Sequence, residues 1–271
     1  MKKLLIAIVT LVVLCGGLWI YGRDQLRPTI NQVTIEAKVS SPLSIVLLAD
    51  IHVDEDVEDL QVLRVMIRQI NEVNPDLILL AGDYTSSPGK IIDLRIHREK
   101  IARLLSELGP APVIAVLGNY EYASQPSAWA KAFDTTSISV LNNQIASTKV
   151  GGQALCIRGI GDRFTNNAVD VPFPSSCEQA LKITLTHDPA AAFDFDLSGL
   201  IFAGHTHCGQ VSFPFLGPLW VPTTAPKEAH CGLYQDDKKS LFVSSGTGTS
   251  LLPIRFGAPA QWDLIRLEPK N

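Results

Sequence analysis

The sequence predicts an α/β fold in which two β-sheets pack together, preceded by an N-terminal transmembrane helix. Three observations predict it. An uncharged apolar run opens the chain, apolar runs of strand length then alternate with helical patterns, and shorter alternating pieces follow after Trp129. The chain has 271 residues, of which 46% are hydrophobic and 18% charged, so it is long enough for one sizeable core. We therefore expect one globular domain behind a membrane anchor.

The N-terminal segment consists of two lysines, an uncharged apolar run over residues 4–20, and then Arg23. A helix over residues 4–21, at about 1.5 Å per residue, nearly matches a bilayer core of about 30 Å. No small-x-small cleavage site closes the run. An uncleaved transmembrane anchor over residues 1–23 is therefore predicted, in preference to a secretory signal or a buried helix.

Charge alone does not orient this anchor, because Lys2 and Lys3 before it are opposed by Arg23 and Arg27 beyond it. Cysteines supply a second observation. The part of the chain after the anchor holds four of them, an even number that can close two bridges in an oxidising compartment. This number favours an exported domain, and four unrelated buried cysteines are the alternative.

Residues 24–42 are polar and predict a tether, with an edge strand near Val33. The domain proper is expected to span residues 43–271. Apolar runs of strand length, separated at first by helical spacing, indicate an α/β layer. The strand-like runs cover residues 43–49, 77–81, 113–117, 183–186 and 200–203, and the helical patterns cover residues 60–70 and 96–108.

After Trp129 the pattern changes to short segments in which apolar and polar residues alternate, such as residues 138–140 and 154–157, separated by turn residues. These pieces predict antiparallel strands with tight turns, and hence a second sheet packed against the first. The net charge of −4 shows no basic excess, so nucleic acid is not an expected partner.

Each of the five strand-like runs ends in side chains that can bind a metal ion. Sites in α/β sheets gather at the carboxyl ends of strands, where all of these residues fall. In an extended chain, residues i and i+2 point to the same side, so Asp50 with His52, and His205 with His207, can each present two ligands to one point. The candidate metal ligands are Asp50, His52, Asp83, Asn119, His187, His205 and His207.

This mixture of carboxylate, imidazole and amide donors suits two divalent ions of Mn, Fe or Zn, and the absence of thiolates argues against a structural zinc cluster. Two ions about 3.5–4 Å apart clamp a phosphate and turn a bridging water into hydroxide. The predicted function is therefore hydrolysis of phosphate esters by a dinuclear metal centre.

The ordered motifs also resemble the calcineurin-like metallophosphoesterases. The resemblance implies a four-layer αββα fold, with two packed mixed β-sheets flanked by helices. The segment 245–259 looks similar to the tail of the membrane-linked bacterial branch, which includes enzymes acting on UDP-2,3-diacylglucosamine and other phosphodiesters. The motifs are Asp50-x-His52, Gly82-Asp83, Gly118-Asn119, His187 and Gly204-His205-x-His207.

Carried over by position, the resemblance implies a role for each ligand. One metal would be held by Asp50, His52 and His207. The other would be held by Asn119, His187 and His205, with Asp83 bridging the two. The same branch is similar in carrying cysteines near the last motif, so we expect the bridges Cys208–Cys231 and Cys156–Cys177. It also implies a single-pass protein of the bacterial inner membrane, with the catalytic domain on the periplasmic side.

One residue departs from the family pattern. Tyr120 stands where the family usually has a histidine that stabilises the transition state or protonates the leaving group, and Glu121 follows it. A tyrosine hydroxyl donates hydrogen bonds at neutral pH but is a weak acid. We therefore expect the metals to carry most of the catalysis, on substrates with a good leaving group such as a pyrophosphate or an aryl ester. The expected catalytic residues are Tyr120, Asn119 and His205.

The substrate is expected to be lipid-linked or close to a membrane. The apolar segment 213–220 either covers a sheet edge, which is the favoured interpretation, or lies exposed beside the site as a surface fit for an acyl chain. A phosphodiesterase or pyrophosphatase is the leading hypothesis. A metal-binding scaffold without activity on the same fold is the alternative.

Overall fold

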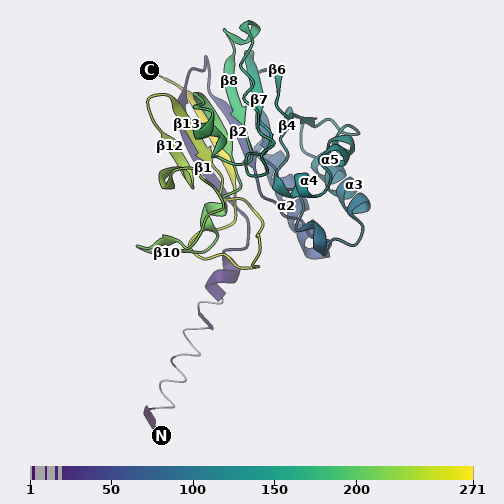
Figure 1. The fold of residues 1–271 in the computed structure, drawn as a ribbon, viewed down its shortest axis with the longest axis vertical. Helices are drawn as coiled ribbons and strands as arrows, with labels where there is room; N and C mark the ends of the chain where they lie inside the picture. Colours follow the sequence, from purple (N-terminus) through teal and green to yellow (C-terminus); the bar gives the residue numbers. More distant parts are fainter. Residues whose placement is uncertain (1, 4–9, 11–15, 18–19, 271) are drawn as a thin grey trace.

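The computed structural model describes residues 2, 3, 10, 16, 17 and 20–270. Its first sheet has six strands (Figure 1). Three of the five motifs, those that contain Asp50, Asp83 and Asn119, follow strands of this sheet. The strands β2 to β5 run parallel, and β14 pairs antiparallel with β2 and parallel with β1. In spatial order they are β1 (Thr29–Ala37), β14 (Gln261–Pro269), β2 (Leu43–Leu48), β3 (Leu77–Leu80), β4 (Val113–Ala115) and β5 (Ser139–Val140).

The second sheet also has six strands and is mixed. Its four central strands run parallel, and an antiparallel strand closes each edge. A separate two-stranded hairpin joins β10 (Ser212–Phe213) to β11 (Gly217–Pro218). In spatial order the second sheet holds β12 (Gly232–Gln235), β13 (Lys239–Val243), β9 (Gly199–Ala203), β8 (Leu181–Leu185), β7 (Gln153–Gly159) and β6 (Gln144–Val150).

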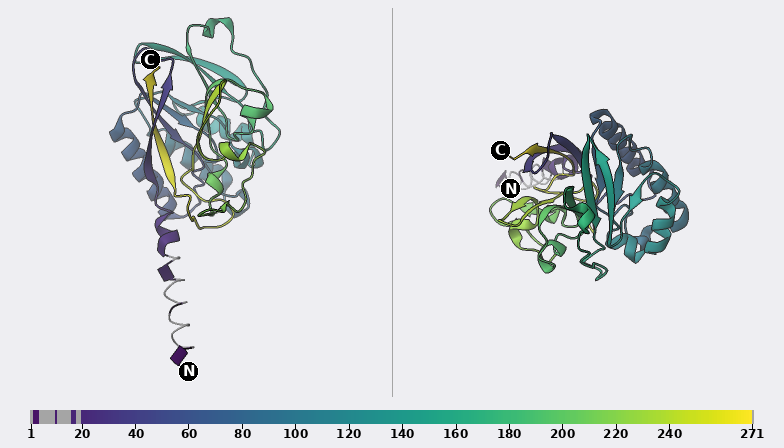
Figure 2. Two further views of the ribbon diagram at one scale, coloured as in Figure 1. Left: turned by 90° about the vertical axis from the view of Figure 1, so that its left-hand side faces the viewer. Right: turned by 90° about the horizontal axis from the view of Figure 1, so that it is seen from above.

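Longer helices cover the outer face of the first sheet, and short ones lie against the second (Figure 2). In α2, buried residues recur at Leu60, Leu63, Ile67 and Ile70, which is the spacing of one helix face. The helices are α2 (Val57–Val73), α3 (Leu94–Leu105), α4 (Asn119–Ala123), α5 (Pro126–Phe133) and α6 (Ala191–Asp194), with 3₁₀ turns η1 (Pro88–Lys90), η2 (Ser175–Cys177), η3 (His207–Gly209) and η4 (Lys227–Ala229).

Alternation along β2 explains the four layers. Val46 and Leu48 pack into the core beneath α2 and α3, whereas Ile45 and Leu47 pack into the core between the two sheets. Successive side chains of a strand point to opposite faces, so a strand buried on both sides is a continuous apolar run. The αββα architecture and the mixed sheets are therefore as the sequence predicted.

The predicted N-terminal transmembrane helix is wrong on this structure. Among the described residues, no helix is long and apolar enough to cross a membrane. Residues 4–9, 11–15, 18 and 19 of the predicted span lie outside the described residues. The finding also overturns the expected localisation as a single-pass inner-membrane protein.

A smaller difference concerns residues 138–140, for which the sequence predicted an antiparallel strand. This segment contributes β5, which pairs parallel with β4 at the edge of the first sheet. The reason is the connection: α4 and α5 lie between β4 and β5, and a helical crossover returns the chain in the parallel direction.

Candidate metal centre

The seven predicted ligands come together where the strands β2, β3, β4, β8 and β9 end. They do so through tight turns, and not through the extended chain expected from the sequence. Left-handed φ angles are costly for residues other than glycine, and such strain clusters at functional sites. Five ligands adopt them: Asp50 (φ 50°), His52 (47°), Asp83 (55°), His205 (69°) and His207 (50°).

The first group consists of Asp50, His52 and His207, all buried. The Nε2 atoms of His52 and His207 are 3.1 Å apart, and Asp50 Oδ1 lies 3.6 Å from His207 Nε2. The backbone N–H of His205 donates to the Asp50 carboxylate at 2.9 Å, which fixes its orientation. Their ligand atoms lie within 4.8 Å of one another, so one ion can contact all three.

The second group consists of Asp83, His187 and His205, also buried. His187 Nε2 lies 3.1 Å from His205 Nδ1 and 3.1 Å from Asn119 Oδ1, so Asn119 joins this group. Asp83 Oδ2 lies 3.4 Å from His187 Nε2 and 3.6 Å from His52 Nε2. Asp83 therefore stands between the two groups.

The outward ring nitrogens of three histidines contact backbone carbonyls. His52 Nδ1 lies 3.2 Å from Thr85 O, His187 Nδ1 lies 2.7 Å from Ala81 O, and His205 Nε2 lies 2.6 Å from Pro222 O. A carbonyl only accepts, so the outward nitrogen carries a proton, and in the neutral ring the inward one offers a lone pair. This is the tautomer that binds a metal.

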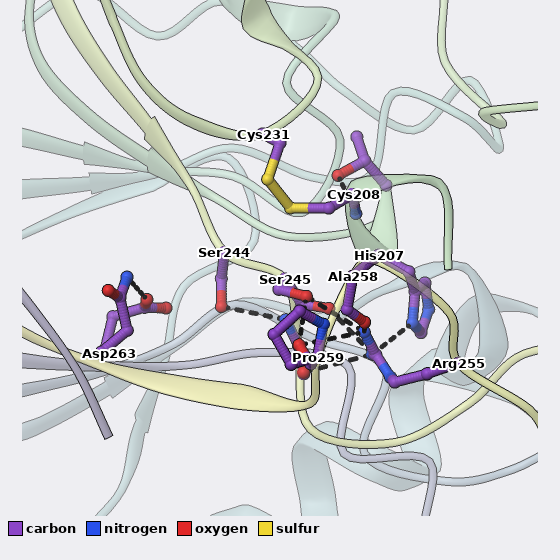
Figure 3. The surroundings of a disulfide bond; sticks show 12 residues. His207, Cys208, Cys231, Ser244, Ser245, Arg255, Ala258, Pro259 and Asp263 are labelled. Atoms are coloured by element: carbon purple, nitrogen blue, oxygen red, sulfur yellow. Dashed lines mark hydrogen bonds between the residues drawn. A yellow bond between two sulfur atoms is a disulfide. The ribbon is translucent and has the colours of Figure 1, made fainter. Parts of the chain in front are cut away.

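The outward ring nitrogen of the fourth histidine, His207, contacts an arginine side chain and not a backbone carbonyl. Arg255 is fully buried, and its guanidinium lies 3.1 Å from His207 Nδ1 while donating to Gly248 O at 2.7 Å (Figure 3). Burial lowers the pKa of Arg255 to about 10, so it stays cationic at neutral pH. Arg255 ties the loop between β13 and β14 to the first group.

Glu121 clamps the two loops that follow β3 and β4. It is fully buried and accepts hydrogen bonds from the backbone N–H groups of Asp83 (2.8 Å), Tyr84 (2.9 Å), Thr85 (3.3 Å) and Gly118 (2.9 Å). Burial and the charge of Asp83 raise the pKa of Glu121 to about 7.

The loops approach each other closely at Gly118. A side chain at this position would collide with the Asp83 carboxylate, so only glycine lets the β4 loop come this near to the β3 loop. The Gly118-Asn119 motif therefore places Asn119 beside the second group for a steric reason.

Burial and the charges of neighbouring ligands shift the pKa values of this centre in both directions. Burial raises the pKa of Asp50 to about 7, whereas His187 and His52 overcome burial and hold that of Asp83 at about 2. Burial lowers the pKa of His52 to about 4 and that of His207 well below its ordinary value. Despite burial, Asp83 and Asp50 raise the pKa of His187 well above its ordinary value.

The donor set fits two divalent ions. Within each group, two imidazole nitrogens face each other at 3.1 Å, which is close to the separation of two nitrogens bound to one ion at about 2.0–2.1 Å. Lone pairs at this separation repel unless a cation or a proton lies between them. Carboxylate, imidazole and amide donors suit Mn, Fe or Zn.

A cavity of about 420 Å³ opens beside these ligands. Asp83, Asn119, His205 and His207 are among the residues that line it. Tyr120 also lines it, with its ring edge-on to His52 at 4.9 Å between centroids. Much of the remaining lining is apolar, and no lysine or arginine of the described chain lines the cavity. The apolar lining is formed by Phe164, Val211, Leu219, Trp220, Leu251 and Leu252.

The segment 213–220 does not cover a sheet edge, contrary to the favoured interpretation. It forms most of the β10–β11 hairpin and the two residues after it, at the end of the domain where residues 20–27 lie (Figure 1). Phe215 is fully exposed, and Leu219 and Trp220 are 71% and 62% exposed at the mouth of the cavity.

Both expected disulfides are present, Cys156–Cys177 and Cys208–Cys231. The second lies directly after His207 and joins η3 to the start of β12 (Figure 3). Sequence reasoning missed Arg255 and the clamping role of Glu121. The only signal for Glu121 was its place directly after the Asn119-Tyr120 pair.

Two groups of buried oxygen and nitrogen donors, side by side at the strand ends of an αββα fold, define a hydrolase of phosphate esters with a dinuclear divalent metal centre. The family model of the calcineurin-like phosphoesterases matches residues 43–209. The chain belongs to this family.

Individual relatives cover most of the chain. It is 28% identical over 270 residues to the uncharacterized metallophosphoesterase YkuE of Bacillus subtilis, covering 94% of this chain and 92% of that protein. It is 26% identical over 234 residues to the phosphodiesterase YaeI of Escherichia coli, covering 84% and 83%. The crystal structure of the calcineurin-like phosphoesterase YfkN from Bacillus subtilis matches with a TM-score of 0.47 at 15% identity, covering 76% and 82%.

Proposed function

We propose that the protein hydrolyses phosphodiesters that carry an apolar, lipid-like substituent, with Mn²⁺ as the metal. Asp50, His52 and His207 would hold one ion. Asn119, His187 and His205 would hold the other, with Asp83 between the two groups as a shared ligand. When bound, the two ions would polarise the phosphoryl oxygens and supply an activated water as nucleophile.

The observation that carries the proposal is the mixed lining of the cavity. It combines metal ligands with apolar side chains such as Leu219 and Trp220. A diester has one negative charge, which the metals can neutralise. A nucleotide diphosphate brings further charge, for which phosphate sites use Arg or Lys. Among the described residues the lining holds no Arg or Lys, which supports a diester with an apolar group over a nucleotide.

The protein's own residues would orient such a substrate. Asn119 and His205 line the cavity, and their side chains would contact a phosphoryl group bound beside the second metal group. Tyr120 extends from the start of α4 into the same cavity and would donate a hydrogen bond to the leaving oxygen. The similarity to YaeI, named a phosphodiesterase, supports this class of reaction.

The test is a series of p-nitrophenyl alkyl phosphates with alkyl chains from methyl to octyl, hydrolysed by the full chain loaded with Mn²⁺. Each methylene that leaves water contributes about 0.8 kcal/mol, so kcat/KM is expected to rise roughly threefold to fourfold per methylene until the apolar part of the cavity lining is covered. A kcat/KM that does not change with chain length would overturn the apolar assignment.

Trp220→Ala is expected to flatten this dependence, because Trp220 lines the cavity. Leu216→Ala is the matched control. Leu216 lies in the same exposed segment at 83% exposure but does not line the cavity, so its replacement is expected to leave the dependence unchanged.

A further inference from the structure

Ser250 lies in the loop between β13 and β14 and lines the same cavity as several of the metal ligands. Its Oγ lies 3.0 Å from the Tyr120 hydroxyl, a contact that joins residues 130 positions apart. Both residues line the cavity beside Asp83, Asn119 and His205. The two hydroxyls therefore form a pair where a bound phosphodiester would place its leaving oxygen.

Both members of this pair are fixed by further contacts. The backbone N–H of Ser250 donates to Gln210 Oε1 at 2.8 Å, and Gln210 Nε2 donates to Leu252 O at 2.8 Å. The backbone N–H of Tyr120 donates to Asp83 Oδ1 at 2.9 Å. The serine is thus held from both sides of its loop, and the tyrosine is held by the carboxylate that stands between the two metal groups.

We propose that Ser250 is a positioning residue for Tyr120, which orients the tyrosine hydroxyl toward the leaving oxygen and stabilises the phenolate that forms when its proton is transferred. The inference rests on the proposed phosphodiester hydrolysis. A hydrogen bond to an ionised oxygen is about twice as strong as one between neutral groups. The Ser250 hydroxyl would therefore favour loss of the Tyr120 proton, which lets a tyrosine act at the position where a histidine was expected.

The step balances as follows. Water adds OH to phosphorus and releases its other proton to solvent. The P–O bond to the leaving group breaks, and its electron pair stays on the leaving oxygen, which takes the Tyr120 proton. The phenolate accepts the hydrogen bond of the Ser250 hydroxyl and then regains a proton from solvent water. The products are a phosphomonoester and an alcohol, and Ser250 keeps its own proton throughout.

The test compares Ser250→Ala, Ser250→Thr and Tyr120→Phe in the Mn²⁺-loaded full chain, on diesters whose leaving phenols range from p-nitrophenol to p-methoxyphenol. The control is Thr249→Ala, since the Thr249 hydroxyl makes no hydrogen bond within the part of the chain that the structure describes. Leaving-group dependence separates a role in proton transfer from a merely structural role.

We expect Ser250→Ala to lower kcat about tenfold to a hundredfold with the poorest leaving phenol and less than about twofold with p-nitrophenol. Ser250→Thr retains the hydroxyl and is expected to restore kcat. Tyr120→Phe is expected to cost at least as much as Ser250→Ala, because it removes the proton donor itself, and the double variant is expected to lose no more than Tyr120→Phe alone.

An equal loss for every leaving group, a fully additive double variant, or no loss would each overturn the inference while leaving the proposed function intact. Absence of wild-type turnover with metal bound would instead overturn the proposed function, and this inference with it.

Discussion

Asp263 gives a stability prediction whose size follows from its surroundings. It lies on β14, almost wholly buried, and accepts a hydrogen bond from Asn31 Nδ2 at 2.8 Å. Burial raises its pKa from 3.8 to about 6. Because the pKa of Asp263 is higher in the folded than in the unfolded chain, the protonated carboxyl group contributes most to the free energy of unfolding below pH 3.8. This contribution is lost as the pH rises through the folded pKa of about 6.

The substitution Asp263→Asn removes this ionisation and keeps the shape of the side chain. A shift of about two pKa units corresponds to about 3 kcal/mol, so Asp263→Asn is expected to raise the free energy of unfolding by roughly that amount at pH 7.5. At pH 3.5 the two proteins are expected to be equally stable.

Urea unfolding at the two pH values measures this difference, with Asp237→Asn as the control because Asp237 is exposed. The reasoning is refuted if Asp263→Asn destabilises the protein at pH 7.5, or changes its stability equally at both pH values.

Two further predictions concern the bridges and the charge of the centre. Replacing both cysteines of a bridge by serine is expected to lower the free energy of unfolding by about 3 kcal/mol for either Cys208–Cys231 or Cys156–Cys177, because their sequence separations of 23 and 21 are similar. Calorimetry is expected to find weaker Mn²⁺ binding only in the Cys208–Cys231 variant, because Cys208 directly follows the ligand His207. Equal Mn²⁺ affinities in the two variants would contradict this. Because the pKa of His187 is raised, Mn²⁺ must displace its proton, so affinity is expected to rise with pH up to that pKa. Calorimetry in buffers of different ionisation enthalpy measures the protons released, and zero release at pH 7 contradicts the assignment.

The metal ligands could be predicted from the sequence because each follows a strand. Apolar runs mark the strands, and parallel strands end at one edge, so Asp50, Asp83 and Asn119 converge whatever the details of the loops. Their left-handed backbone could not be predicted, since it depends on the hydrogen bonds between neighbouring loops, such as Asp50 N–H to Gly82 O at 3.0 Å.

The supporting residues carry no such signal. Ser250 meets Tyr120 across 130 positions, and Arg255 meets His207 across 48, so only the folded chain pairs them. The exposure of residues 213–220 could not be predicted from the sequence either. An apolar stretch that covers a sheet edge and one that borders a cavity can have the same composition.

The central claim, that this centre hydrolyses phosphodiesters with two metal ions, is tested most directly by titrating the metal-free full chain with Mn²⁺ while following hydrolysis of bis-p-nitrophenyl phosphate. The account predicts no turnover without metal and activity that rises until two ions are bound per chain. Two bound ions without turnover would favour the scaffold alternative, and full turnover in the metal-free chain would contradict the account.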